Sequence, residues 1–402
     1  MTGEIIGMKK RYRILAKNEL VDNNTFVTGL NNNDVIIGPS GAGKTRGYVM
    51  PNILRMNESM VIADTKGQLI EELGETLKAN GYVVKCLDFT GYRESCGYNP
   101  FDYIRYYKET DSYRMKDLKT IAAALVPLTS RRDPYWELAG RQVVEYLGAY
   151  TLECLPKEEQ NLVSVCKLFN IMGTQPYRQL FRELELLYPE SYAVSVYKML
   201  ESCSEADKTY ESIRMILAQK LYMYEDEEVK EMLTKDDRID FKTMGREKTA
   251  LFLTISDTDR SMDQLISLFY AQAFHELCDS ADHDFMYGRL KIPVRFYLDD
   301  FAANVFIPDF DKLIAVIRSR EISVSIILQS LSQLEQMYGA AGAKTILNNC
   351  DNCLYLGGQD VQTAEFISRK ANKTASSILN MPLQEAWLFQ RGREPRQVEK
   401  YA

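Results

Sequence analysis

Residues 38–45 of this chain read Gly38-Pro39-Ser40-Gly41-Ala42-Gly43-Lys44-Thr45, which fits the phosphate-loop pattern G-x-x-x-x-G-K-[ST] at every constrained position. The short apolar run 34–37 before the loop is typical of a buried strand, and residues 46–50 after it resemble the opening of a helix. Backbone N–H groups in such a turn, with the positive end of a helix behind them, hold the phosphates of a nucleotide. The alternative is a chance glycine-rich turn, and the order of strand, loop and helix favours the nucleotide site.

The residues of the loop can be assigned to parts of the expected ligand. Lys44 is expected to reach the β- and γ-phosphates, and Thr45 is expected to give its hydroxyl to Mg²⁺. ATP and Mg²⁺ are therefore the predicted cofactors. The candidate cofactor-binding residues are Gly38, Pro39, Ser40, Gly41, Ala42, Gly43, Lys44, Thr45 and Arg46.

Length and composition limit the classes of protein to be considered. A chain of 402 residues is long enough for two domains or more. The formal net charge of −7 argues against a protein that coats nucleic acid with its whole surface, but it leaves a basic pore open. The sequence has no run of about 18 uncharged apolar residues and does not begin with a basic and then an apolar segment, so we expect a cytoplasmic protein without a transmembrane segment.

Cysteine and histidine give little sign of a metal centre. The eight cysteines are scattered, which fits a reducing compartment. Cys350 and Cys353 have C-x-x-C spacing, but no second pair or histidine cluster completes a zinc site, so we expect them at the edge of a strand. The two histidines, His275 and His283, fall in or just after a helix-like segment, and histidine-based catalysis is not expected.

The pattern of apolar residues alternates between strands and helices in both outer parts of the chain. Strands are predicted at 34–37, 60–63, 82–87, 249–255, 294–298, 324–328, 353–356 and 385–389. Helices are predicted at 67–80, 261–278, 309–318 and 361–371. This alternation predicts an α/β fold with a mostly parallel sheet.

The middle of the chain is helical instead. Amphipathic stretches follow one another at 116–125, 135–155, 162–171, 176–187, 191–200 and 206–222, with almost no strand signal between them. The pattern predicts an all-helical domain inserted into a single nucleotide-binding domain. The expected boundaries are 1–110 for the first half of the nucleotide-binding domain, 111–237 for the insertion and 238–402 for the second half.

Two carboxylates follow the predicted strand 294–298. Asp299 and Asp300 come directly after this strand, and α/β sheets bind their ligands at the carboxyl ends of strands. We expect Asp299 to hold Mg²⁺, directly or through water, and Asp300 to polarise the attacking water. The alternative is an aspartate pair in an ordinary turn. Asp300 is one methylene shorter than glutamate, so the sequence does not decide whether its carboxylate reaches the attacking water.

Two further polar residues could serve ATP hydrolysis. Gln329 ends the strand 324–328, where it could sense the γ-phosphate, and Arg318 ends a predicted helix. We place Arg318 at the edge of the sheet that carries the phosphate loop, where an arginine offered across a subunit boundary could stabilise the transition state. The alternatives are a loop glutamine and an arginine that complements a helix dipole. The predicted catalytic residues are Lys44, Asp299, Asp300, Arg318 and Gln329.

The chain resembles the coupling proteins of conjugative type IV secretion systems, the TraG-type DNA-transfer ATPases within the larger FtsK- and HerA-like group. The resemblance extends over about residues 33–392 and includes the phosphate loop. The other matching motifs are Ala63-Asp64-Thr65-Lys66-Gly67, Tyr98-Asn99-Pro100-Phe101, Asp133-Pro134-Tyr135-Trp136, Leu298-Asp299-Asp300-Phe301-Ala302, Ile317-Arg318-Ser319-Arg320-Glu321-Ile322, Ile327-Leu328-Gln329-Ser330, and Asn349-Cys350-Asp351 ahead of Leu354-Tyr355-Leu356-Gly357-Gly358.

The resemblance implies a RecA-like ATPase domain with an inserted all-α domain, assembled as a homo-hexamer around a channel. ATP hydrolysis would drive single-stranded DNA, led by a bound relaxase of the relaxosome, toward the type IV secretion apparatus at the inner face of the cell membrane. Many members carry Asp-Glu where this chain has Asp299-Asp300, which leaves the hydrolysis rate open. Most members also begin with transmembrane helices, and this sequence shows no such segment.

Two other functions compete with a DNA-translocating coupling protein. One is an FtsK- or HerA-like DNA pump or helicase without a role in secretion. The other is an ATP-gated adaptor, in which the helical insertion binds substrate proteins and Asp300 makes turnover negligible. A GTPase is disfavoured because the chain has no Asn-Lys-x-Asp guanine motif.

Overall fold

The computed structural model describes residues 11–91, 94–128, 134–203, 207–301 and 305–401, with the backbone alone described at 201–203 and 207–210. Two motif residues named above, Asp133 and Ala302, lie outside this set.

The chain forms two compact units. The first comprises residues 1–86, 240–258 and 274–402, and the second comprises 87–239 and 259–273.

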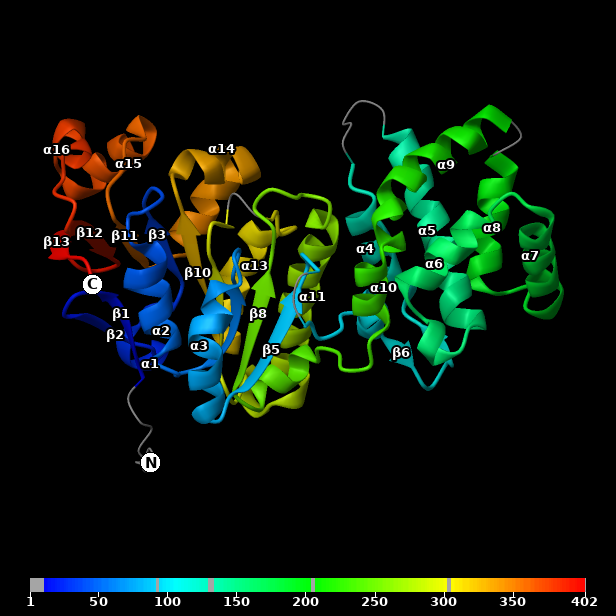
Figure 1. Ribbon diagram of the computed structural model, residues 1–402, viewed down its shortest axis with the longest axis horizontal. Coiled ribbons are helices and arrows are strands. Elements are labelled where there is room, and N and C mark those ends of the chain that lie inside the picture. Colours follow the sequence, from blue (N-terminus) through cyan, green and yellow to red (C-terminus); the bar gives the residue numbers. More distant parts are fainter. Residues whose placement is uncertain (1–10, 92–93, 129–133, 204–206, 302–304, 402) are drawn as a thin grey trace. The chain divides into compact units, whose positions relative to one another are not determined.

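The first unit is built on a nine-stranded sheet with the order β13-β12-β11-β3-β10-β9-β4-β8-β5 (Figure 1). Its strands are β3 (Asp34–Ile37), β4 (Ser59–Ala63), β5 (Val83–Asp88), β8 (Thr249–Thr254), β9 (Val294–Leu298), β10 (Ile322–Leu328), β11 (Asn352–Tyr355), β12 (Glu385–Gln390) and β13 (Arg396–Glu399). β3 pairs in parallel with both β10 and β11, while β12 and β13 continue the sheet in antiparallel pairing. The predicted α/β fold with a mostly parallel sheet is confirmed.

Helices cover this sheet and bury its apolar side chains. They are α2 (Met50–Ile53), α3 (Gln68–Ala79), the part of α11 (Asp263–Asp284) from Phe274 onward, α13 (Phe310–Val316), α14 (Leu331–Asn348), α15 (Val361–Ala371) and α16 (Ala375–Leu379). Every residue of β3, β4, β8, β9 and β10 is buried, which is why these strands read as largely apolar segments without an exposed polar face. Leu69, Leu73 and Leu77 of α3 join Ile62 and Phe252 of the sheet in one core cluster, and each such side chain contributes about 1.5–3 kcal/mol by burial.

Several elements of this unit were not predicted from the sequence. An antiparallel hairpin of β1 (Tyr12–Ala16) and β2 (Glu19–Asp22) precedes the short helix α1 (Thr25–Thr28). β1 carries the fully buried Arg13. α14 was missed as well, and Gly339 within it has φ of 70°, so the helical period is interrupted there.

The second unit is mostly helical. Its helices are α4 (Met115–Leu125), α5 (Tyr135–Cys154), α6 (Leu162–Asn170), α7 (Gln175–Leu187), α8 (Tyr192–Cys203), α9 (Asp207–Leu221) and α10 (Glu227–Thr234). Helix α5 contacts α4, α6, α8 and α9 and buries Val144, Leu147 and Ala149 completely or nearly so. A hairpin of two-residue strands, β6 (Tyr106–Tyr107) and β7 (Ser112–Tyr113), shows that the unit is not purely helical.

This unit is larger than the insertion predicted at 111–237. It begins at Leu87 because the turn-rich segment after β5 packs into it. Tyr98 is fully buried there, and its hydroxyl donates to Gln272 Oε1 at 2.6 Å while its ring lies 5.2 Å from that of Phe269. Such irregular segments carry no periodicity that would assign them to a domain. Among the described residues, no helix is both long and apolar enough to cross a membrane.

Candidate nucleotide-binding site

The phosphate loop leaves the carboxyl end of β3, which lies between β11 and β10 in the sheet. Gly41 and Gly43 have φ of 77° and 89°, a region that residues with a Cβ rarely adopt. A Cβ on Gly38 would lie 2.9 Å from Leu356 Cβ, so this position also requires glycine. The loop leads into the π-helical turn η1 (Thr45–Val49), which continues into α2. The predicted order of strand, loop and helix is therefore present.

Lys44 is buried and folds back over its own loop. Its Nζ donates to Gly38 O at 2.9 Å and to Pro39 O at 3.1 Å, and it lies 3.9 Å from Asp300 Oδ1. An ammonium has three donors, and these two contacts leave one for a ligand on the side where Asp300 lies. This places a positive charge where a loop of this type presents the phosphates of a nucleotide.

Thr45 and Asp299, the predicted metal ligands, are in direct contact. Thr45 Oγ1 donates to Asp299 Oδ2 at 2.8 Å, and Asp300 N donates to Asp299 Oδ1 at 3.0 Å. Burial and the neighbouring Asp300 carboxylate raise the pKa of Asp299, and these effects outweigh the hydrogen bond from Thr45. A carboxylate in such a site is stabilised in its charged form by a cation. Hydroxyl and carboxylate oxygens are the hard ligands that Mg²⁺ prefers, so the residues present fit that ion.

Gln329 and Asp300 complete this side of the site. They follow β10 and β9, which are the next strands to β3 in the sheet. Gln329 Nε2 donates to Asp300 Oδ1 at 3.4 Å, and Asp300 adopts a left-handed backbone with φ of 46°. Four of the five predicted catalytic residues therefore converge at the carboxyl edge of the sheet.

Arg318 does not join them, and its predicted place at the edge that carries the loop is wrong. It lies in the turn η7 (Ile317–Arg320) that precedes β10, and its Nη2 donates at 3.3 Å to the carbonyl of Gly29, which precedes β3. Since β10 and β3 are parallel, residues that precede both strands lie at the amino edge. The seven residues of β10 separate this edge from the loop by about 23 Å. A helix that precedes a parallel strand must end at that strand's amino end.

A cavity of about 650 Å³ lies on the other side of the phosphate loop. The loop contributes residues 39–43, and Arg46 and Gly47 follow. The opposite walls are largely apolar and comprise Leu15, Leu354, Leu356, Ile378, Leu379, Met381, Pro382 and Leu383, with Gln384, Lys400 and Tyr401. This volume and lining are typical of a small-ligand pocket. The sequence did not predict it, because its walls come from segments that no local pattern connects.

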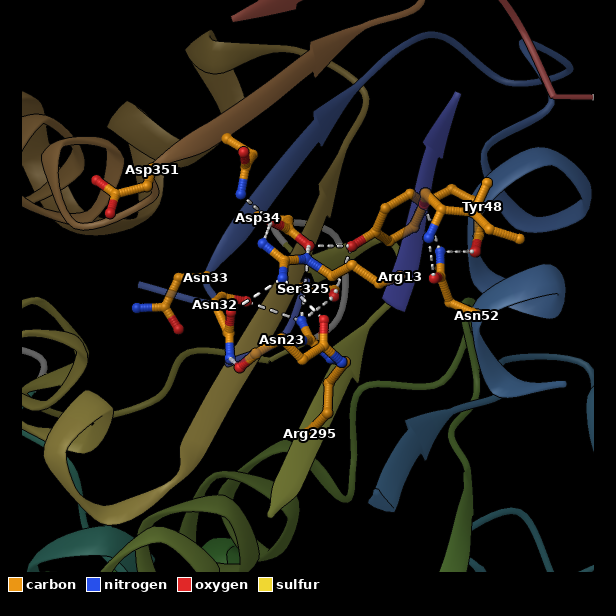
Figure 2. A network of polar contacts seen from close by, with 12 residues as sticks. Arg13, Asn23, Asn32, Asn33, Asp34, Tyr48, Asn52, Arg295, Ser325 and Asp351 are labelled. Carbon is orange, nitrogen blue, oxygen red and sulfur yellow. Dashed lines mark hydrogen bonds and ion pairs between the residues drawn. The ribbon is translucent and has the colours of Figure 1, made fainter. Parts of the chain in front are cut away.

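A buried polar network joins β3, which leads into the loop, to β1, η1 and β9 (Figure 2). Arg13 of β1 binds both carboxylate oxygens of Asp34, with Nε to Oδ2 at 2.7 Å and Nη2 to Oδ1 at 2.9 Å. Tyr48 of η1 donates its hydroxyl to Asp34 Oδ2 at 2.6 Å, and Arg295 Nη1 lies 3.6 Å from the same oxygen. Burial alone raises the pKa of Asp34, but the two arginines outweigh it and hold that pKa below its ordinary value. The network thereby connects the strand before the loop to the helix after it.

Comparison with known proteins agrees with this geometry. Residues 2–379 match the model of the family described as type IV secretory system conjugative DNA transfer. The VirD4 protein of Rhizobium radiobacter is 24% identical over 359 residues, and that of Rhizobium rhizogenes is 22% identical over 369 residues. These matches cover 86% and 91% of this chain but only 50% and 53% of the relatives, so the chain spans about half the length of the curated relatives it matches.

Solved structures share the fold. The conjugative coupling protein TrwBdeltaN70 in complex with sulphate superposes with a TM-score of 0.69 at 18% identity, covering 92% of this chain and 85% of that chain. TrwB in complex with ADP and Mg²⁺ gives a TM-score of 0.67 at 18% identity over 92% and 84% of the two chains. VirB4 of Thermoanaerobacter pseudethanolicus gives 0.55 at 14% identity, covering 100% and 98%. The RecA-like α/β fold is therefore common to all of them, and the resemblance found in the sequence is confirmed.

Because the family match extends over residues 2–379, this chain belongs to the type IV secretory system conjugative DNA-transfer family.

Proposed function

We propose that this chain is the ATP-driven motor part of a conjugative coupling protein. It binds Mg-ATP at the phosphate loop and uses hydrolysis to move relaxase-bound single-stranded DNA toward a type IV secretion apparatus. The observation that carries the proposal is the contact of Thr45 Oγ1 with Asp299 Oδ2 at 2.8 Å, beside Lys44 and Asp300, in a member of a DNA-transfer family. TrwB structures with ADP and Mg²⁺ and with a non-hydrolysable ATP analogue support the choice of cofactors.

The side chains divide the work at the bound nucleotide. Lys44 would exchange its loop carbonyls for β- and γ-phosphate oxygens, and Thr45 and Asp299 would hold the metal. Mg²⁺, when bound, would neutralise the charge that develops on the phosphates. Asp300 would orient the attacking water, and Gln329, which already donates to Asp300 Oδ1, would connect that carboxylate to the presence of a γ-phosphate.

Arg318 has a role only across a subunit boundary in this proposal. Its exposed guanidinium lies at the amino edge of the sheet, too far from its own loop to reach the same nucleotide. In a homo-hexameric ring, the amino edge of one subunit would supply Arg318 to the loop of its neighbour.

The helical insertion, residues 111–237, would recruit relaxase and accessory proteins, and the assembly would act at the inner face of the cell membrane.

Single-turnover hydrolysis with and without single-stranded DNA tests the proposal. Lys44→Ala removes charged hydrogen bonds worth about 2–3 kcal/mol, so we expect a loss of about 30- to 150-fold in ATP affinity or turnover. Unchanged binding and hydrolysis in this variant would reject the nucleotide site. DNA-stimulated hydrolysis in the parent protein supports a motor.

An ATP-gated adaptor is the second candidate function. It is favoured by the short side chain of Asp300, which is already engaged by Gln329 at 3.4 Å and faces Lys44 at 3.9 Å. ATP binding without hydrolysis in the parent would support it. Asp300→Asn should leave binding intact and suppress hydrolysis. Asp300→Glu should raise turnover if reach limits water activation, whereas a fall of about tenfold, or 1.4 kcal/mol in the barrier, would mean that the site is built around aspartate.

A further inference from the structure

A lysine outside the phosphate loop lines the cavity beside it. Lys400 follows β13, and its Nζ lies 3.4 Å from the carbonyl oxygen of Ala42 in the loop. Burial lowers the pKa of Lys400, and no carboxylate among the described residues offsets this effect. Lys17 offers a contrast nearby, because it is exposed and forms an ion pair with Glu399. Half-buried cations without a counter-ion are costly, so the position of Lys400 calls for an anionic ligand.

The backbone around Lys400 is held in place. Its N–H donates to Gln384 O at 2.9 Å, and the preceding Glu399 accepts from Lys17 N at 3.1 Å. On the other side, Tyr401 packs against Gly47 of the helix that follows the loop, where an added Cβ would lie only 2.7 Å from Tyr401 O. The lysine is therefore presented to the cavity by a segment that is fixed on both sides.

The cavity identifies which part of a nucleotide Lys400 would meet. Lys44, Thr45 and Asp299, which would hold the metal and the β- and γ-phosphates, are not part of its lining. The loop residues up to Gly43 and then Arg46 do line it, together with the apolar walls. The space therefore suits the nucleoside and the phosphate next to it.

We propose that Lys400 is a second nucleotide-binding lysine, which contacts the α-phosphate of the nucleotide from the cavity side of the loop. The inference rests on the proposed ATP site. It extends that site to Lys400, a residue more than 350 positions from the loop in the sequence, which follows β13 and contacts Ala42 O. The lysine acts in binding, and it contributes equally to the affinity for ATP and for ADP because both contain the α-phosphate.

Isothermal titration of the whole chain with Mg-ATP and with Mg-ADP tests this assignment. Lys400→Met keeps most of the apolar stem and removes the charge, and we expect both dissociation constants to rise by about tenfold or more. Lys400→Arg should retain most of the affinity. Lys17→Met is the matched control, since it makes the same chemical change at a neighbouring exposed position and should leave both constants unchanged. Thermal unfolding of each variant verifies the fold.

The outcomes separate this inference from the ATP site on which it rests. If Lys44→Ala weakens binding and Lys400→Met does not, the role of Lys400 is wrong and the ATP site stands. A loss for ATP alone, with ADP unchanged, also overturns it, because the lysine would then act at the γ-phosphate. If neither lysine affects either nucleotide, both proposals fall.

Discussion

Replacing Arg13 by methionine is expected to lower the free energy of unfolding by about 3 kcal/mol. Arg13 and Asp34 are only 2% and 1% exposed, and the guanidinium binds both carboxylate oxygens. Breaking such a buried pair by removing one partner costs about 3–5 kcal/mol, because the remaining charge loses its compensation. Arg295 stays 3.6 Å from Asp34 and the Tyr48 hydroxyl still donates, so we expect the lower end of this range.

Urea unfolding at neutral pH measures the loss, and a second arginine provides the control. Arg396 pairs with Glu19 at 2.6 Å, yet both side chains are 27% exposed. Surface pairs contribute only about 0.2–1 kcal/mol, so Arg396→Met should change the midpoint far less than Arg13→Met. Comparable losses in the two variants would contradict the argument from burial.

The pH dependence of the loss follows from the pKa of Asp34. Despite burial, Arg13 and Arg295 hold this pKa below its ordinary value, so its contribution to stability is present above the unfolded-state pKa and is lost as pH falls through the folded-state pKa. Without Arg13, burial of the charged Asp34 carboxylate is compensated less well, so the folded variant is destabilised less when Asp34 is protonated than when it is charged. The difference between parent and variant should therefore shrink as pH falls below about 4. A difference under about 1 kcal/mol at neutral pH, or one that grows in acid, would refute the reasoning.

Three other changes test the site. Asp299→Asn should weaken nucleotide binding in Mg²⁺ but not in EDTA, and an equal loss in both would contradict its role at the metal. Arg318→Ala should bind ATP normally and lose about 10³–10⁵ in DNA-stimulated hydrolysis. Mixing it with Lys44→Ala chains should restore some activity, and no rescue in confirmed rings would reject a role in trans. Gly47→Ala places a Cβ 2.7 Å from Tyr401 O, so the free energy of unfolding should fall by about 1–3 kcal/mol. An unchanged urea midpoint would show that the segment around Tyr401 moves aside without cost.

Local pattern was enough to predict the parts of the fold that are buried on both faces. β3, β9 and β10 consist entirely of buried residues, so each strand appears in the sequence as a largely apolar run, although β9 contains Arg295 and β10 contains two serines. The hairpin of β1 and β2 was missed because its second strand is mostly solvent-accessible; its first strand contains Arg13, a fully buried arginine. Such a residue is satisfied by partners that only the folded chain brings together.

The candidate site also has a part that the sequence predicts and a part that it does not. The contact between Thr45 and Asp299, 254 residues apart, could be predicted because loop and carboxylate both follow parallel strands and so meet at one edge of the sheet. The same rule, applied to the helix before β10, would have placed Arg318 at the opposite edge. No comparable rule leads to Lys400, since β13 pairs in antiparallel fashion at the end of the sheet and its approach to the loop depends on tertiary packing.

The buried network bears on nucleotide binding as well as on stability. Asp34 begins the strand that leads into the phosphate loop, and Tyr48, which donates to it at 2.6 Å, belongs to the helix that leaves the loop. One carboxylate therefore connects the strand before the loop to the helical turn after it before a ligand arrives, and a loop whose flanking elements are ordered in advance loses less entropy on binding. Tyr48→Phe removes this connection, together with the 3.0 Å contact between the Tyr48 hydroxyl and Ser325 Oγ, and leaves the arginines paired with Asp34. If the connection serves the loop, the dissociation constant for Mg-ADP should rise although the variant remains folded, whereas an unchanged affinity in a destabilised variant would limit the network to stability.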